Sequence, residues 1–236
     1  MTAVTERATQ ATAPARVPLH SPPLVRLLAA LDDTGALPGV ARPQASVGER
    51  LGQWLDWTDA IALSQTLNQV PPPPAHPVPA AHAAQRASTA LARVRADCSR
   101  AILQDPVFQP DQRASADLGD IRRAAQARQR GMAAAIAPLR AQLRGLLAAR
   151  SAPLAHLAAL DATLDAALAE RERHSLSSVV AQLEQQFQQG QQAGADHWRD
   201  AFFQSMQQLL LAELDLRLQP VQGLADALGE ALGEAA

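Results

Sequence analysis

The 236-residue chain has no tyrosine and no lysine, and aromatic residues make up only 3% of it. A core with so few rings has to be built from Leu, Ala, Val and Ile, and the abundance of Leu and Ala favours helices over strands. The chain also lacks runs of alternating β-branched residues bounded by turns, which an antiparallel sheet needs. We therefore predict an all-α protein.

Cysteine is nearly absent as well. Cys98 is the only one, so a disulfide within the chain is excluded and a cytoplasmic location is favoured. The N-terminus lacks the basic start and apolar core of a secretion signal, and no apolar run reaches the ~18 residues that a bilayer-spanning helix needs. We expect a cytoplasmic protein without a transmembrane segment.

The longest helical pattern runs from about Asp117 to Gln189 in two halves. The first half carries a stripe with coiled-coil-like spacings of four and three, formed by Met132, Ile136, Leu139, Leu143 and Leu146. The second half carries two Leu-rich stripes with a break near Arg171. At the junction, Ser151 is suited to cap a helix and Pro153 suits its first turn. The pattern predicts an elongated helical bundle built on a long antiparallel hairpin.

Charge is unevenly distributed along this hairpin. Residues 81–150 hold twelve Arg against five Asp, whereas residues 151–236 hold four Arg against twelve acidic residues. In an antiparallel hairpin the Arg residues at 140–150 lie beside Asp161 and Asp165. We therefore expect the basic and acidic fields to cancel in part within the hairpin.

Proline clusters divide the N-terminal third of the chain. Residues 1–18 show no periodicity and are expected to be a disordered tail, followed by a helical segment at 19–70. Six Pro residues between 71 and 79 indicate a polyproline linker over residues 71–84. The alternative is that this stretch docks in an aromatic-lined groove. The hairpin and the C-terminal helices are expected to occupy residues 85–236.

A capping box predicts a helix inside the N-terminal segment. In it, Ser46 and Glu49 satisfy each other's free backbone donors, so the helix is expected to run from there to about Leu67. This helix contains Trp54 and Trp57, on different faces. We therefore expect it to lie between neighbouring elements.

The C-terminal region follows Gly190 and Gly194, which interrupt a Gln-rich helix. Asp196 is suited to cap the next helix, and Pro220 is expected to end it. The apolar residues of that helix form a wide stripe that includes Trp198, Phe202, Met206, Leu209, Leu210 and Leu214. We expect it to be buried on more than half of its surface and to be followed by a last weak helix.

No motif for catalysis or metal binding stands out. The six His residues have no Cys or carboxylate partner at zinc-finger, zincin or di-iron spacing, and no P-loop, GxGxxG or GxSxG motif occurs. Cys98 lies on the apolar face of its helix, where an inert buried thiol is expected. Acid–base chemistry is an alternative for the acidic pairs Asp56 with Asp59, Asp161 with Asp165 and Glu213 with Asp215. Carboxylates on amphipathic helices are typical of the solvated face, and Glu213 forms a favourable ion pair with Arg217. We expect neither an enzyme nor a bound cofactor or metal.

Three segments carry a resemblance to a known family. They are LGQWLDWTDAIALS at 51–64, IAPLR at 136–140 and LLLAELDLRLQP at 209–220. From about Leu24 to Leu224 the chain resembles a bacterial family called domain of unknown function 3348. The resemblance implies no catalytic or binding residues. It implies a genomic context near proton channels of the flagellar-stator or TolQ/ExbB type and OmpA-like outer-membrane proteins.

The apolar surface exceeds what a two-helix hairpin can cover, and large uncovered apolar patches mark interaction sites. We therefore favour a non-enzymatic scaffold or adaptor that binds a protein partner or a second copy of itself. The resemblance adds a link to an envelope proton-channel or motor complex. The candidate contact residues are Trp54, Trp57, Trp198, Phe202, Leu209 and Leu210.

The alternative function is nucleic-acid binding by the Arg-rich arm at 122–150, whose side chains could follow a phosphate backbone. The candidate residues are Arg122, Arg123, Arg130, Arg140 and Arg144. The arm has no aromatic side chains to stack on bases, and the acidic arm that follows offsets its charge. Protein contacts are therefore the favoured function.

Overall fold

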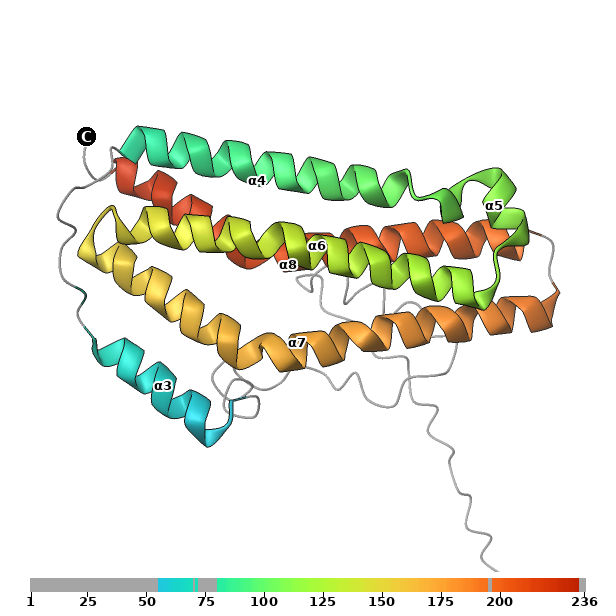
Figure 1. The fold of residues 1–236 in the computed structure, drawn as a ribbon, viewed down its shortest axis with the longest axis horizontal. Helices are drawn as coiled ribbons and strands as arrows, with labels where there is room; N and C mark the ends of the chain where they lie inside the picture. Colours follow the sequence, from blue (N-terminus) through green and yellow to red (C-terminus); the bar gives the residue numbers. More distant parts are fainter. Residues whose placement is uncertain (1–54, 70, 72–79, 195–196, 234–236) are drawn as a thin grey trace, which may run out of the picture. The chain divides into compact units, whose positions relative to one another are not determined.

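The computed structural model describes residues 55–69, 71, 80–194 and 197–233, and among these it contains helices and no strand (Figure 1). The helices are α3 (Trp57–Asn68), α4 (Ala80–Leu103), the 3-10 turn η1 (Pro106–Phe108), α5 (Pro110–Ser115), α6 (Leu118–Ala148), α7 (Ala152–Ala193) and α8 (Trp198–Gly233). The all-α prediction is confirmed. The predicted tail, Trp54 and most of the predicted linker lie outside the described residues, and α4 begins at Ala80, inside the range predicted for the linker.

The predicted hairpin is formed by α6 and α7, which pack against each other. Asp117 caps α6 by accepting a hydrogen bond from the backbone N–H of Asp120 at 2.8 Å. Ser151 caps α7 in the same way, with Leu154 as the donor at 3.4 Å. Gly194 ends α7 with φ at +60°, a left-handed conformation that favours glycine. Local capping chemistry therefore determines where each arm begins and where α7 ends.

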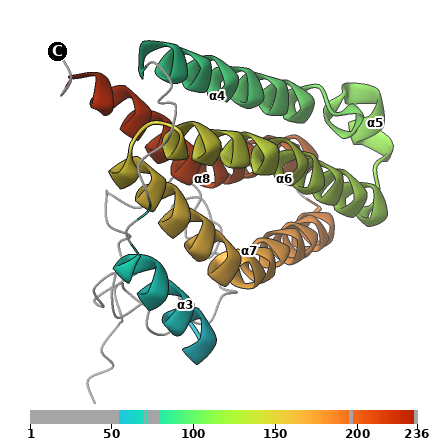
Figure 2. The same ribbon diagram turned by 60° about the vertical axis from the view of Figure 1, so that its left-hand side comes forward.

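Helices α4, α6, α7 and α8 form the bundle, in which α8 contacts each of the other three (Figures 1 and 2). The α6 stripe faces the core through Met132, Ile136, Leu139 and Leu143. Its next buried member is Leu147, whereas Leu146 is only half-buried. A straight helix has 3.6 residues per turn, whereas alternating spacings of four and three average 3.5. The predicted stripe therefore drifts off the core face, and the core position passes from Leu146 to Leu147.

Helix α8 continues through Pro220 to Gly233, so the prediction that Pro220 ends it is wrong. A proline inside a helix costs about 3 kcal/mol, because it removes one backbone hydrogen bond and crowds the preceding turn. Beyond Pro220, Val221, Leu224 and Leu228 are buried. Burying each such side chain contributes about 1.5–3 kcal/mol. The packing of this last segment therefore outweighs the local penalty.

Helix α3 also differs from its prediction. The backbone at Asp56 is extended, and the carboxylates of Asp56 and Asp59 form a capping box, so the helix begins at Trp57. The predicted single helix from Ser46 to about Leu67 is therefore wrong at Asp56, where the described helix starts anew. Ser46 itself lies outside the described residues. No residue of α3 is buried, and within the described chain α3 packs against α7. The expectation that this helix lies between neighbours is wrong for the part that is described.

Five of the seven aromatic residues gather where the end of α7 meets the start of α8. Four edge-to-face pairs, with ring centroids 5.1–6.1 Å apart, link Phe108, Phe187, Trp198, Phe202 and Phe203. The Trp198 ring lies so close to Gly190 that a Cβ at this position would be 2.3 Å from it. The glycine therefore permits the close approach that joins the two helices.

Candidate functional site

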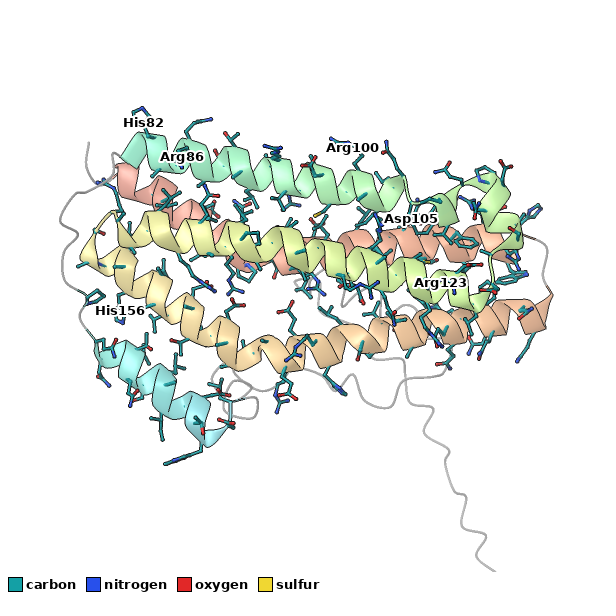
Figure 3. The ribbon with its side chains drawn as sticks, in the orientation of Figure 1. His82, Arg86, Arg100, Asp105, Arg123 and His156 are labelled. Carbon is teal, nitrogen blue, oxygen red and sulfur yellow. The ribbon has the colours of Figure 1, made fainter. Side chains whose placement is uncertain are left out.

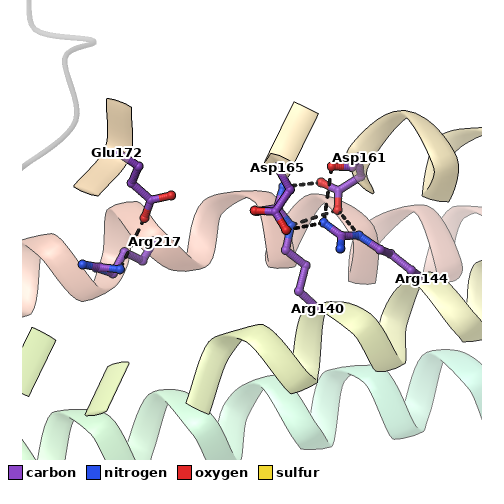
Figure 4. A network of polar contacts seen from close by, with 6 residues as sticks. All are labelled: Arg140, Arg144, Asp161, Asp165, Glu172 and Arg217. Atoms are coloured by element: carbon purple, nitrogen blue, oxygen red, sulfur yellow. Dashed lines mark hydrogen bonds and ion pairs between the residues drawn. The ribbon is translucent and has the colours of Figure 1, made fainter. Parts of the chain in front are cut away.

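A cluster of four charged side chains joins the two arms of the hairpin (Figure 4). Arg140 on α6 donates two hydrogen bonds to Asp161 on α7, at 2.8 and 2.5 Å, and one to Asp165 at 2.6 Å. Arg144 donates to both carboxylates at 2.7 Å. The Asp161 side chain is only 12% exposed. The predicted pairing of the basic arm with the acidic arm is confirmed at these residues.

The cluster sets the protonation of Asp161. Burial by itself would raise the pKa of this carboxyl, but the hydrogen bonds and charges of Arg140 and Arg144 outweigh it, so the pKa of Asp161 is lower than usual. Both guanidinium groups are committed to these carboxylates. The cluster is therefore suited to fixing the register of the two arms, because bidentate pairs of this kind are geometrically specific.

The remaining basic candidates lie toward the start of α6. Arg122 donates two hydrogen bonds to Glu184 on α7, and Arg123, labelled in Figure 3, pairs with Asp120 within its own helix. Arg130 is exposed. The structure therefore brings together two of the five basic candidates, Arg140 and Arg144, and leaves the others apart.

The apolar candidates divide by burial. Phe202, Leu209 and Leu210 lie in the core of the bundle, with 6%, 0% and 0% of their surface exposed, and Trp198 is half-buried in the aromatic group. Trp57 is 82% exposed. Helix α4, which packs on both α6 and α8, covers apolar surface that the hairpin alone would leave open. Trp57 is thus the described candidate with the most surface available to a partner.

Helix α3 makes polar contacts with α7 and exposes several large apolar side chains. The hydroxyl groups of Thr66 and Thr163 lie 2.9 Å apart, and the Nε2–H of His156, labelled in Figure 3, donates to the carbonyl oxygen of Thr66 at 2.8 Å. Ile61 is 43% exposed and Leu67 55%, whereas Leu63 is half-buried. We call Trp57, Ile61 and Leu67 the α3 apolar surface.

A buried glutamate is the main feature that the sequence pattern did not identify. Glu213 was expected on a solvated face, but its side chain is 0% exposed. It accepts hydrogen bonds from Gln129 at 3.0 Å and from Arg217 at 2.9 Å, and Arg217 also pairs with Glu172 (Figure 4). The available signal was its position as the one charged residue within LLLAEL at 209–214, where apolar neighbours surround it on all sides.

Burial raises the pKa of the Glu213 carboxyl, and the hydrogen bond from Gln129 and the charge of Arg217 compensate only in part. The ionised form is therefore less favoured in the folded chain than in the unfolded chain, so Glu213 reduces stability as pH rises through its folded pKa. We expect the stability of the Glu213→Gln variant relative to the wild type to be greater at pH 7 than at about pH 4. Urea unfolding at both pH values measures this difference. A stability difference that stays constant with pH would contradict the prediction.

A cavity of about 680 Å³ lies between α6, α7 and α8. Ile136 and Ala133 of α6, Leu168 of α7 and Leu216 of α8 contribute to its apolar lining. Arg140 and Arg217, which belong to the two polar networks, also line it. No pattern in the sequence predicts this space, because it depends on how three helices diverge.

Neither a metal site nor a membrane span is found in the described ranges. Within residues 55–69, 80–194 and 197–233, no three His, Cys, Asp or Glu side chains gather in a way that could hold a metal ion. None of the described helices combines the length and the apolar character needed to cross a bilayer. Cys98 is buried, as expected for a thiol on the apolar face of α4.

Comparison with known proteins places the chain in a family without supplying a site. No curated protein and no solved structure matches the chain. The model of one family matches residues 10–230, which is nearly the whole chain. The chain belongs to the family described as Protein of unknown function (DUF3348).

Proposed function

We propose that the chain is a non-enzymatic helical adaptor that binds a protein partner through the α3 apolar surface. The observation that carries this proposal is the 82% exposure of Trp57 on a helix that meets α7 through polar contacts. Tryptophan is among the residues most enriched at binding hot spots, because it buries a large apolar area with little loss of conformational freedom. Exposing it in a chain with only three Trp is costly unless a partner covers it.

The neighbouring residues fit the same role. Ile61 lies one turn after Trp57 on α3, so both side chains point in a similar direction and offer one apolar strip. An amphipathic helix with such a strip suits a partner that presents a groove or a second helix. The hydrogen bonds that Thr163 and His156 make with Thr66 hold α3 on α7 and leave the strip free.

Site-specific crosslinking tests this proposal. A photoreactive phenylalanine analogue replaces Trp57 in the full chain, expressed in its native cells, and the matched control carries the analogue at Arg93 on α4, whose side chain is 83% exposed. We expect a discrete heavier adduct from position 57 and none from position 93. An adduct of twice the chain mass would identify a second copy, and any other mass a different partner. Equal labelling from both positions would refute the docking role of α3.

We also propose that the partner belongs to an envelope proton-channel or motor complex. This part rests on the family resemblance alone. The crosslinked adduct should then sediment with the membrane fraction, although the chain on its own has no described helix that could cross a bilayer. An adduct found only in the soluble fraction would rule out the envelope link while leaving the adaptor role intact.

Nucleic-acid binding by residues 122–150 is the weaker candidate. Arg140 and Arg144 are committed to Asp161 and Asp165, and Arg122 to Glu184. Phosphate binding would have to break these pairs or rely on the few exposed guanidinium groups that remain, such as that of Arg130. No observation favours this function over protein contact.

A further inference from the structure

One stretch of α7 is exposed to solvent at every residue. Residues 170–175 have the sequence ERERHS, and all six are exposed. Because a helix has 3.6 residues per turn, six consecutive residues point in every direction around the axis. In the following segment Leu176, Val179 and Val180 are buried again. The exposed turn lies in the middle of α7, where the helix changes direction (Figure 1), and it borders the cavity.

The cavity has the size and lining of a small-molecule site. Its volume of about 680 Å³ falls inside the range of roughly 300–1,000 Å³ typical of ligand pockets. Carbon-rich side chains from three helices form its wall, among them Ile136, Leu168, Leu216 and Pro220. The polar side chains of the lining are Arg140, Asp165, Arg171, Glu172, Arg173, His174, Ser175 and Arg217. A ligand that fills it would therefore place an apolar portion against this wall.

The charged side chains at the cavity determine what the polar portion of a ligand would be. Two carboxylates also line the cavity, and each pairs with an arginine of the lining, Asp165 with Arg140 and Glu172 with Arg217. Arg173 donates through Nε to the carbonyl oxygen of Ala169 at 3.2 Å, but within the described chain its two terminal nitrogens make no hydrogen bond or ion pair. The His174 imidazole, which also lines the cavity, likewise contacts no polar partner among the described residues. The side chains of Arg173 and His174 can therefore donate hydrogen bonds to a ligand at the exposed turn.

We propose that this cavity binds a single-chain anionic amphiphile, a molecule with one acyl chain and a carboxylate or comparable anionic head. The acyl chain lies along the wall formed by α6 and α8, and the head accepts hydrogen bonds from Arg173 and His174. Arg173 supplies a permanent positive charge, and its planar guanidinium group matches a carboxylate. The site is separate from the α3 apolar surface, so the two proposals stand independently.

Dodecanoate, kept below its micelle concentration, is the probe, and equilibrium dialysis of the full chain measures its binding. We expect one saturable site per chain and at least about tenfold weaker binding of uncharged dodecanol. The double variant Arg173→Gln/His174→Gln should also bind dodecanoate about tenfold more weakly, because hydrogen bonds to charged groups are typically worth a change of that order. Both positions are exposed, so this variant is expected to fold.

A pair of neighbouring substitutions on α6 locates the site. Ala133 and Ala134 are both exposed, but only Ala133 lines the cavity. Ala133→Trp should abolish binding by filling the space, whereas Ala134→Trp should bind like the wild type. Undiminished binding by Ala133→Trp, or no saturable binding by the wild type, would overturn the proposal. A third outcome would also overturn it. If the chain bound only phosphatidylglycerol vesicles, and neither Ala133→Trp nor the double variant weakened that binding, the lipid contact would lie elsewhere on the chain.

Discussion

Leu209→Ala should lower the free energy of unfolding by about 3 kcal/mol, and it should do so without changing the mass of the protein in solution. Leu209 has no exposed surface. Removing a fully buried leucine side chain forfeits its transfer free energy and leaves a cavity, which together typically cost about 2–5 kcal/mol. Urea unfolding followed by circular dichroism measures the first effect, and light scattering the second. The residue is thus expected to stabilise the fold rather than a contact with a partner.

The matched control is Leu103→Ala at the end of α4, where the leucine side chain is 50% exposed. We expect its cost to stay below about 1 kcal/mol, because much of the side chain is already in contact with water. Equal costs for Leu209→Ala and Leu103→Ala would contradict the burial of Leu209 in the core. A mass change in Leu209→Ala alone would show that Leu209 contributes to an interface in solution. The adaptor proposal would then move from α3 to α8.

Asp161→Ala should be the most damaging change in the charged cluster, with a loss of about 3 kcal/mol in stability at neutral pH. The substitution removes the carboxylate that accepts hydrogen bonds from both Arg140 and Arg144. It leaves two largely buried guanidinium groups that share Asp165 alone, and an uncompensated buried charge costs about 3–5 kcal/mol. Urea unfolding of the variant at pH 7 measures the loss.

The pH dependence supplies an internal check. The pKa of Asp161 is lowered in the folded chain, so its contribution is fully present above the ordinary carboxyl pKa and is lost as pH falls through the folded value. The gap in stability between the wild type and Asp161→Ala should therefore narrow below about pH 4. The control Asp97→Ala breaks only exposed pairs with Arg93 and Arg100 and should cost at most about 1 kcal/mol. An Asp161 variant as stable as the Asp97 variant would show that the cluster does not hold the arms together.

The charged cluster could be predicted because its cause is sequence-local. Once Ser151 and Pro153 mark the turn, an antiparallel arrangement places residues at equal distances from the turn beside each other, and Arg140 then faces Asp161. The start of α6 at Asp117 follows from a capping box that involves only four neighbouring residues. Such features depend on interactions between residues close together in the chain, so they can be predicted from the sequence.

Helix α8 shows where local rules fail. Proline is a strong helix breaker in isolation, yet Pro220 is accommodated because Val221, Leu224 and Leu228 are buried beyond it. The helical spacing of the apolar residues was visible, but the surface that covers them was not. The same limit applies to Phe202, Leu209 and Leu210, which have the composition of an interface and lie in the core.

By itself, the sequence determined the all-α class, the hairpin with its turn, and the pairing of the basic arm with the acidic arm, because each follows from spacing, capping and charge along the chain. Only the tertiary structure decided that Glu213 is buried, that Trp57 is exposed and that a cavity lies beside residues 170–175. Burial depends on which other helix covers a given face, and that choice is made by packing between residues far apart in the chain.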